Sequence, residues 1–225
     1  MFSNLEKIIK VKDLSVSDRD IKKYLGKNDD ATNNYFLDIA KKELKKLDEE
    51  AVKVGVQFFT ASLLGEKLNI NNVVFYPEEE FVDYLNGAKQ VAIFACTLGV
   101  DLENMLHQYS FSEEMELAFV SDILGSIIVE TASGYILDKV TSEAKEKSLK
   151  TTNTLSPGNC GWDIAEQEKL FSLLPNDFLG IEIKEGGMMN PVKSISGIIG
   201  VGKKVKFKHT DCALCNSVNC AYRSV

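Results

Sequence analysis

Two short segments in the last third of the chain concentrate residues that could bind a ligand: residues 156–163, SPGNCGWD, and residues 188–197, MMNPVKSISG. Each places glycine and proline, which fix unusual backbone geometry, beside hydroxyl, amide, thiol or ammonium groups. Backbone this tight usually allows the main chain to approach another molecule closely, and the first segment leads directly into an expected helix. We therefore expect these two segments to carry the chemistry of the chain.

Two single side chains attract attention for their surroundings. Cys160 stands just before an expected helix N-terminus, a position that lowers a thiol pKa, so it is either a ligand-facing or redox thiol or a small residue that fits a tight turn. Glu130 is a lone acid among apolar neighbours in a long helical pattern. Because burying an unpaired carboxylate is costly, Glu130 is either satisfied by backbone amides or binds a ligand.

A cysteine-bearing tail follows residue 208, with Cys212, Cys215 and Cys220 within nine residues. Two cysteines separated by two residues can turn both thiolates toward one ion, and we expect zinc or an iron–sulfur cluster here. A fourth ligand is missing, and His209 or Cys160 could supply it. Free thiols or an adventitious disulfide are the alternative.

A lysine group, Lys203, Lys204, Lys206 and Lys208, precedes this tail. It is either a solvated strand face or a surface that meets an acidic partner. No phosphate loop, GxGxxG turn, HExxH pair or GxSxG elbow is present, which argues against most kinase, dehydrogenase and hydrolase functions.

The composition narrows the class of protein. The chain has 225 residues, of which 44% are hydrophobic, and a formal net charge of -7. The excess of acidic residues argues against binding to nucleic acid or to anionic membranes. The chain contains no run of eighteen apolar residues, so no membrane span is predicted. The N-terminus lacks signal-peptide features, so we expect a cytoplasmic protein, in which an odd number of cysteines stays reduced.

Hydrophobic periodicity predicts an alternation of helices and strands. We expect helices over 30–54, 77–85, 112–147 and from 163 to Pro175, and strands over 56–59, 72–76, 90–97, 180–185 and 193–201. The small residues in the middle of the 112–147 helix predict that it runs through the centre of the domain. The organisation expected is one α+β domain, with an N-terminal part over 1–110, a motif-bearing part over 111–208 and the tail over 209–225.

The motif-bearing part resembles a known family. Residues 156–158, Trp162-Asp163, Glu166-Gln167 and the stretch LFSLLP at 170–175, with the segment 188–197, are similar to the activation domain of cobalamin-dependent methionine synthase. The resemblance is strong from about Ile127 onward. A chain of this size resembles the form in which activation is a free-standing subunit.

The resemblance implies a fold and an activity. The fold is a single C-shaped α+β domain with a twisted antiparallel sheet flanked by helices. Such a domain binds S-adenosylmethionine and presents it to cobalamin that a methionine synthase subunit or another corrinoid protein holds. An electron from a flavodoxin-like donor and a methyl group from S-adenosylmethionine then convert the inactive cob(II)alamin form back into methylcobalamin. The protein contributes positioning, and the cobalamin carries the chemistry.

Some site residues follow from the resemblance. It assigns Glu130 to the cationic amino end of the ligand, and it places Ser156 and Gly158 where the backbone touches the ligand. The neighbouring Asn159 and Cys160 belong to the same expected cofactor-binding turn.

The chain departs from the family pattern at three positions. Thr154 stands where the family has an arginine that clamps the ligand carboxylate, and Asn159 and Ile199 stand where it has tyrosines. Lys193 is the candidate to replace the arginine. The cysteine tail is not part of the pattern in the fused enzymes, so two other functions stay open: a metal- or iron–sulfur-bearing activator that does not bind S-adenosylmethionine, and a non-catalytic cap for a cobalamin domain.

Overall fold

The computed structural model describes residues 2–25, 30–47, 49–77, 79–111, 114–159 and 162–207. Within them an antiparallel sheet runs in the order β4-β3-β2-β5-β9-β6, and β1 pairs with β2 beside this path. Its strands are β1 (Leu5–Lys10), β2 (Ala51–Leu64), β3 (Lys67–Ile70), β4 (Val73–Phe75), β5 (Ala88–Thr97), β6 (Lys150–Leu155) and β9 (Ser194–Gly202). A separate hairpin joins β7 (Glu182–Ile183) to β8 (Met189–Asn190).

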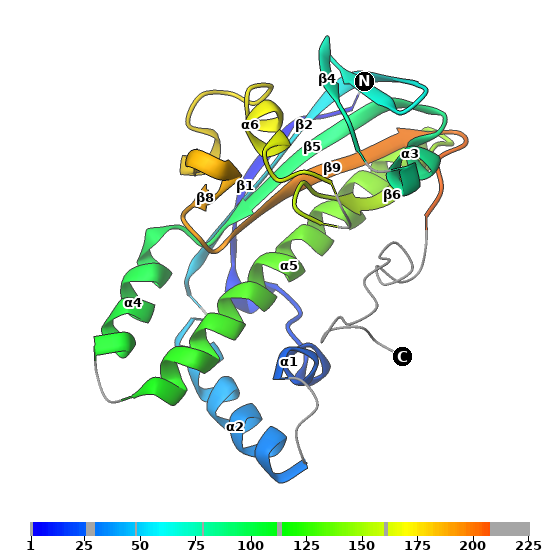
Figure 1. Ribbon diagram of the computed structural model, residues 1–225. Helices are drawn as coiled ribbons and strands as arrows, with labels where there is room; N and C mark the ends of the chain where they lie inside the picture. Colours follow the sequence, from blue (N-terminus) through cyan, green and yellow to red (C-terminus); the bar gives the residue numbers. More distant parts are fainter. Residues whose placement is uncertain are drawn as a thin grey trace.

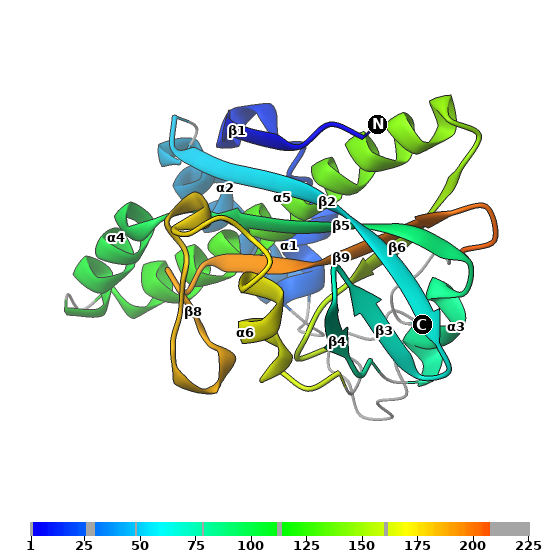
Figure 2. The same cartoon turned by 90° about the horizontal axis from the view of Figure 1, so that it is seen from above.

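Helices cover both faces of this sheet (Figures 1 and 2). They are α1 (Asp18–Leu25), α2 (Asp30–Lys46), α3 (Glu79–Leu85), α4 (Val100–Phe111), α5 (Met115–Glu146) and α6 (Glu166–Phe171), with short 3-10 turns at Val11–Asp13, Phe178–Gly180 and Glu185–Gly187. The α+β class with an antiparallel sheet flanked by helices, which the family resemblance implies, is confirmed.

The central strand β5 shows why two cores form. Its residues from Val91 to Cys96 are all fully buried, and they alternate between the two faces of the sheet. Val91, Ile93 and Ala95 belong to one hydrophobic cluster, and Ala92, Phe94 and Cys96 belong to the other. Burial also raises the pKa of the Cys96 thiol, because the thiolate is disfavoured away from water. Both faces of the sheet are therefore covered, as the apolar run over 90–97 predicts.

One core lies between the sheet and the long helix α5, against which α1, α2 and α4 pack (Figure 1). By length and composition alone, α5 is the one helix in the described chain that is long and apolar enough to cross a membrane. Half of its most apolar stretch is buried inside the fold. The prediction that this helix runs through the centre of the domain is confirmed.

The other core lies under α3, α6 and the β7–β8 hairpin. Trp162 is fully buried there, with its ring edge-on to Phe75 at 6.3 Å and to Phe81 at 6.0 Å between centroids. These aromatic contacts join the residues after the Pro-Gly segment to the β3–β4 end of the sheet.

Several predicted element boundaries are wrong. The helix expected over 30–54 ends at Lys46, because residues 51–54 begin β2 and pair with both β1 and β5. Gly55, the residue after that predicted helix, lies inside β2, where a Cβ would come 2.5 Å from the ring of Phe178. The strand expected over 180–185 shortens to Glu182–Ile183, and the strand expected to begin at Lys193 begins at Ser194.

Candidate functional site

A groove of about 430 Å³ opens between α1, α5, the Pro-Gly turn and the connection from β8 to β9. Its lining contains three of the residues expected to bind a cofactor: Glu130, Asn159 and Lys193. They come from separate parts of the chain, so tertiary structure has brought them together. The full lining is Lys23, Tyr24, Ser126, Val129, Glu130, Asn159, Val192, Lys193, Ser194 and Ile195.

One polar stripe of α5 forms a wall of the groove. Asp122, Ser126 and Glu130 follow one another at intervals of four residues and therefore lie on one side of the helix. Glu130 is exposed, so the expectation of a buried carboxylate is wrong. Its neighbours Ile128 and Ala132 are buried in the core between α5 and the sheet, whereas Glu130 faces the groove.

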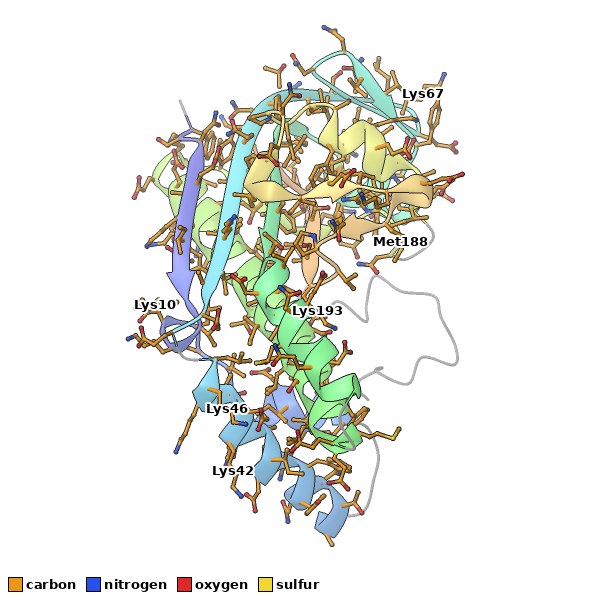
Figure 3. All side chains as sticks on the ribbon, turned by 90° about the vertical axis from the view of Figure 1, so that its left-hand side faces the viewer. Lys10, Lys42, Lys46, Lys67, Met188 and Lys193 are labelled. Atoms are coloured by element: carbon orange, nitrogen blue, oxygen red, sulfur yellow. The ribbon has the colours of Figure 1, made fainter. Side chains whose placement is uncertain are left out.

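Lys193 reaches α5 from the residue just before β9, and Figure 3 shows it beside the green helices. The residue is only 8% exposed, and its Nζ lies 2.8 Å from Asp122 Oδ1 and donates a hydrogen bond to Ser126 Oγ at 3.0 Å. Its stem crosses α5 at Gly125, where a Cβ would come 3.1 Å from the Lys193 Cγ and Cδ atoms. The absence of a side chain at Gly125 thus lets the lysine stem lie against the helix with its ammonium at the groove.

The Pro-Gly segment forms a compact turn. The Gly158 amide donates to the Trp162 carbonyl at 2.7 Å, and the Asn159 amide donates to the Ser156 carbonyl at 3.1 Å. Gly158 has a φ of 85°, a left-handed conformation that favours glycine. Ser156 is buried and Gly158 is exposed, and neither lines the groove, whereas Asn159 does. The predicted turn is therefore present, and it meets the groove through Asn159.

A buried carboxylate anchors this turn. Glu166 Oε2 accepts hydrogen bonds from Trp162 Nε1 at 2.6 Å and from the Tyr76 amide at 2.9 Å, and Glu166 Oε1 pairs with Lys169 at 2.7 Å. The next residue, Gln167, donates a hydrogen bond to Ser196 Oγ of β9. The two motif segments are thus held to each other through α6.

The backbone of the turn also touches β9 directly. A Cβ at Gly197 would come 2.5 Å from both the Leu155 carbonyl oxygen and Ser156 Oγ. Only glycine permits this approach, which explains why glycine follows the serines of the second segment.

Two of the departures from the family pattern face each other. Thr154 of β6 pairs directly with Ile199 of β9. Ile199 is fully buried in the core beneath α5, and neither residue lines the groove. The two positions at which the resemblance implies an arginine and a tyrosine are therefore cross-strand neighbours, occupied by threonine and isoleucine.

Sequence reasoning missed the contribution of α1. Ile21 and Leu25 anchor this short helix in the core, which leaves Lys23 and Tyr24 on the groove. Glu130, Lys23 and Tyr24 also line a neighbouring hollow of about 160 Å³. The amphipathic pattern of residues 18–25 could have predicted the helix, but no local signal indicates that it packs beside Glu130.

The charges of the groove fit a zwitterion. Lys23 and Lys193 are cationic and Glu130 is anionic, while Asn159, Ser126 and Ser194 provide neutral hydrogen-bonding groups. An α-amino acid group carries a carboxylate and an ammonium that could pair with these opposite charges.

The remaining expected site residues lie outside the described part of the chain. These are Cys160 in the turn and Cys212, Cys215 and Cys220 in the tail, together with His209. Among the residues that the structure describes, no group of three histidine, cysteine, aspartate or glutamate side chains could hold a metal ion.

The fold is similar to that of the crystal structure of the MetH reactivation domain bound to AdoHcy. The TM-score is 0.69 at 14% sequence identity, and the alignment covers 92% of this chain and 80% of that chain. No family model and no curated protein matches the sequence. At this identity the similarity concerns the fold.

Proposed function

We propose that this chain binds S-adenosylmethionine in the groove between α1 and α5 and serves as an activation component of cobalamin-dependent methionine synthase. The observation that carries the proposal is the meeting of Glu130, Asn159 and Lys193 in one groove. The fold that contains this groove is similar to a reactivation domain bound to AdoHcy, a ligand that differs from S-adenosylmethionine by the transferable methyl group.

The proposed roles follow from charge and position. Glu130 pairs with the ammonium of the ligand, and Lys193, with Lys23 opposite, pairs with its carboxylate. Lys193 is well suited to this task because Asp122, its present partner, has a side chain that is 63% exposed and can return to water. Val129 and Ile195 offer apolar walls to the remainder of the ligand.

In the proposed reaction, cob(II)alamin on a partner takes one electron from a flavodoxin-like donor and a methyl cation from the sulfonium, which leaves methylcobalamin and S-adenosylhomocysteine. The residues of this chain hold the sulfonium in place for a bulky partner. Support for partner docking comes from the rim, where Val192 lines the groove and is 63% exposed. We propose that a cobalamin-bearing methionine synthase subunit, or another corrinoid protein, covers this rim.

Isothermal titration of the full chain with S-adenosylmethionine and S-adenosylhomocysteine tests the binding step. A reactivation assay with a cobalamin-dependent methionine synthase that lacks its own activation region, a chemical reductant and S-adenosylmethionine tests the function. We expect saturable binding of one ligand per chain and recovery of methylcobalamin that depends on this chain. Glu130→Gln should weaken both readouts, and Glu146→Gln, a change of the same kind at the far end of α5, should leave them unchanged.

If neither ligand binds and no methylcobalamin is recovered, the proposal is wrong. Reduction of cob(II)alamin to cob(I)alamin that depends on this chain, without ligand binding and without methylcobalamin, would instead favour an activator that does not use S-adenosylmethionine.

A further inference from the structure

A second cavity, of about 800 Å³, lies at the other end of α5. It is bounded by α3, the C-terminal half of α5, the start of β6 and residues 204–207. Its lining is Asp83, Tyr84, Leu137, Asp138, Thr141, Lys145, Leu149, Lys150, Thr151, Lys204, Val205, Lys206 and Phe207. At 1.5 Å per helical residue, Lys145 lies roughly 20 Å along α5 from Glu130, so this cavity is separate from the proposed S-adenosylmethionine groove.

The cavity has an apolar floor. Leu137 of α5 and Leu149, which follows it, are half-buried, and Val205 and Tyr84 are each only 3% exposed. Phe207 stands at the edge and is 48% exposed. A concave surface of this kind suits the apolar or aromatic body of a small molecule.

The rim of the cavity is cationic. Lys145, Lys150 and Lys204 are exposed, and within the described chain no carboxylate forms an ion pair with any of them. Lys206 is paired with both carboxylate oxygens of Asp83 at 2.8 Å, which leaves Asp138 as the one acid of the lining without such a pair among the described residues. Positive charge therefore gathers here on a chain whose net charge is -7.

The lysines of the rim are held in place by the fold. A Cβ at Gly87, whose φ is 86°, would come 2.7 Å from the Cβ of Lys204, so the backbone at Lys204 lies closely against this turn. The Lys206 amide donates to the Tyr84 carbonyl at 3.1 Å. Lys150 begins β6 and pairs with Gly202 of β9. The fold thus fixes the backbone from which Lys150 and Lys204 extend at the rim of the cavity.

We propose that this cavity binds a small amphipathic anion, in which an apolar or aromatic body carries a carboxylate, sulfonate or phosphate group. The body lies on Leu137, Leu149 and Val205, and the anionic group lies among Lys145, Lys150 and Lys204. Lys204, one of the lysines that precede the tail, then has a binding role. The proposal does not depend on S-adenosylmethionine binding.

The test uses two fluorescent probes of similar shape and different charge: 1-anilinonaphthalene-8-sulfonate, an anion, and neutral N-phenyl-1-naphthylamine. The full chain is titrated with each probe, as are the triple variant K145Q/K150Q/K204Q and a control, K22Q/K42Q/K45Q, which removes the same charge from α1 and α2. Circular dichroism checks that all three proteins are folded.

We expect one anionic probe to bind per chain, and affinity for it to fall by about tenfold or more in the first triple variant because charge-assisted contacts are lost. The control should stay within about twofold of the unchanged chain, since distant exposed charges are screened by salt. Neutral-probe affinity should be equal in all three, and Leu149→Asp should abolish binding of both probes. Equal binding of the anionic probe to both triple variants, or binding that never saturates, would overturn the proposal.

Discussion

Replacement of Lys193 by methionine is the sharpest perturbation of the proposed S-adenosylmethionine site. Methionine keeps an unbranched stem that can lie across Gly125, and it removes only the ammonium. The lost contact to the ligand is a charge-assisted hydrogen bond in a largely buried position, because Lys193 is 8% exposed. Such a bond contributes about 1.5–3 kcal/mol, which corresponds to a roughly 10- to 150-fold weaker dissociation constant.

The fold itself should tolerate this change. Lys193 Nζ lies 2.8 Å from Asp122 Oδ1, but the Asp122 side chain is 63% exposed and can be solvated when its partner is removed. Because methionine leaves no buried charge behind and Asp122 regains water, the free energy of unfolding in urea should fall by about 1 kcal/mol or less. A loss of ligand affinity therefore cannot be assigned to unfolding.

Calorimetric titration with two ligands isolates the carboxylate contact. S-adenosylmethionine carries the amino acid group, and 5′-methylthioadenosine lacks it. We expect Lys193→Met to weaken S-adenosylmethionine binding and to leave 5′-methylthioadenosine binding within about twofold of the unchanged chain. Lys42→Met, an equivalent change on α2, serves as the matched control and should alter neither affinity.

Two outcomes would show that the proposed role of Lys193 is wrong, and each points to a different reason. If the unchanged chain binds S-adenosylmethionine and Lys193→Met binds it equally well, the carboxylate is held elsewhere, and Lys23 becomes the residue to change. If both ligands weaken equally in Lys193→Met, the lysine shapes the groove without contacting the carboxylate.

Three further predictions address the turn and the tail. Gly197→Ala should lower the free energy of unfolding in urea by about 1–3 kcal/mol, because its Cβ would come 2.5 Å from the Leu155 carbonyl oxygen. Gly134→Ala, whose Cβ would meet no atom beyond its own helix within 4 Å, should raise it by about 0.5–1 kcal/mol, and the opposite order would contradict the packing described. Glu166→Ala should lower the free energy of unfolding by about 1–3 kcal/mol and alter the fluorescence of Trp162, the single tryptophan, because it removes the acceptor 2.6 Å from the Trp162 Nε1. Glu166→Gln should retain most of the stability and of the fluorescence, and identical losses in both variants would refute the acceptor role. Metal analysis after anaerobic purification should find zinc or iron in the full chain and a loss of it in Cys215→Ser; equal metal in both would exclude the tail as its site.

The sequence predicts the elements whose signal is local. The apolar run over 90–97 predicts a strand buried on both faces, and the small residues of the 112–147 helix predict its central place. Glycine and proline mark the tight turn at 156–159. These features follow from backbone geometry and side-chain size, which a short stretch of sequence is enough to indicate.

The limits of β2 show what the sequence leaves ambiguous. Residues 51–54 continue the helical spacing of α2, and the same residues suit a strand. Pairing with β1 on one side and β5 on the other decides in favour of the strand. Because both partners are distant in sequence, local periodicity could not identify them.

The sequence likewise predicts one part of the candidate site and leaves the other part to the tertiary structure. The sequence alone identifies residues whose side chains could bind a charged ligand, namely Glu130, Asn159 and Lys193. Only the tertiary structure decides that α1 adds Lys23, that Glu130 faces the groove, and that Thr154 pairs with Ile199. The physical reason is that helix packing and strand register set these contacts, and both are fixed by the burial of apolar surface across the whole chain.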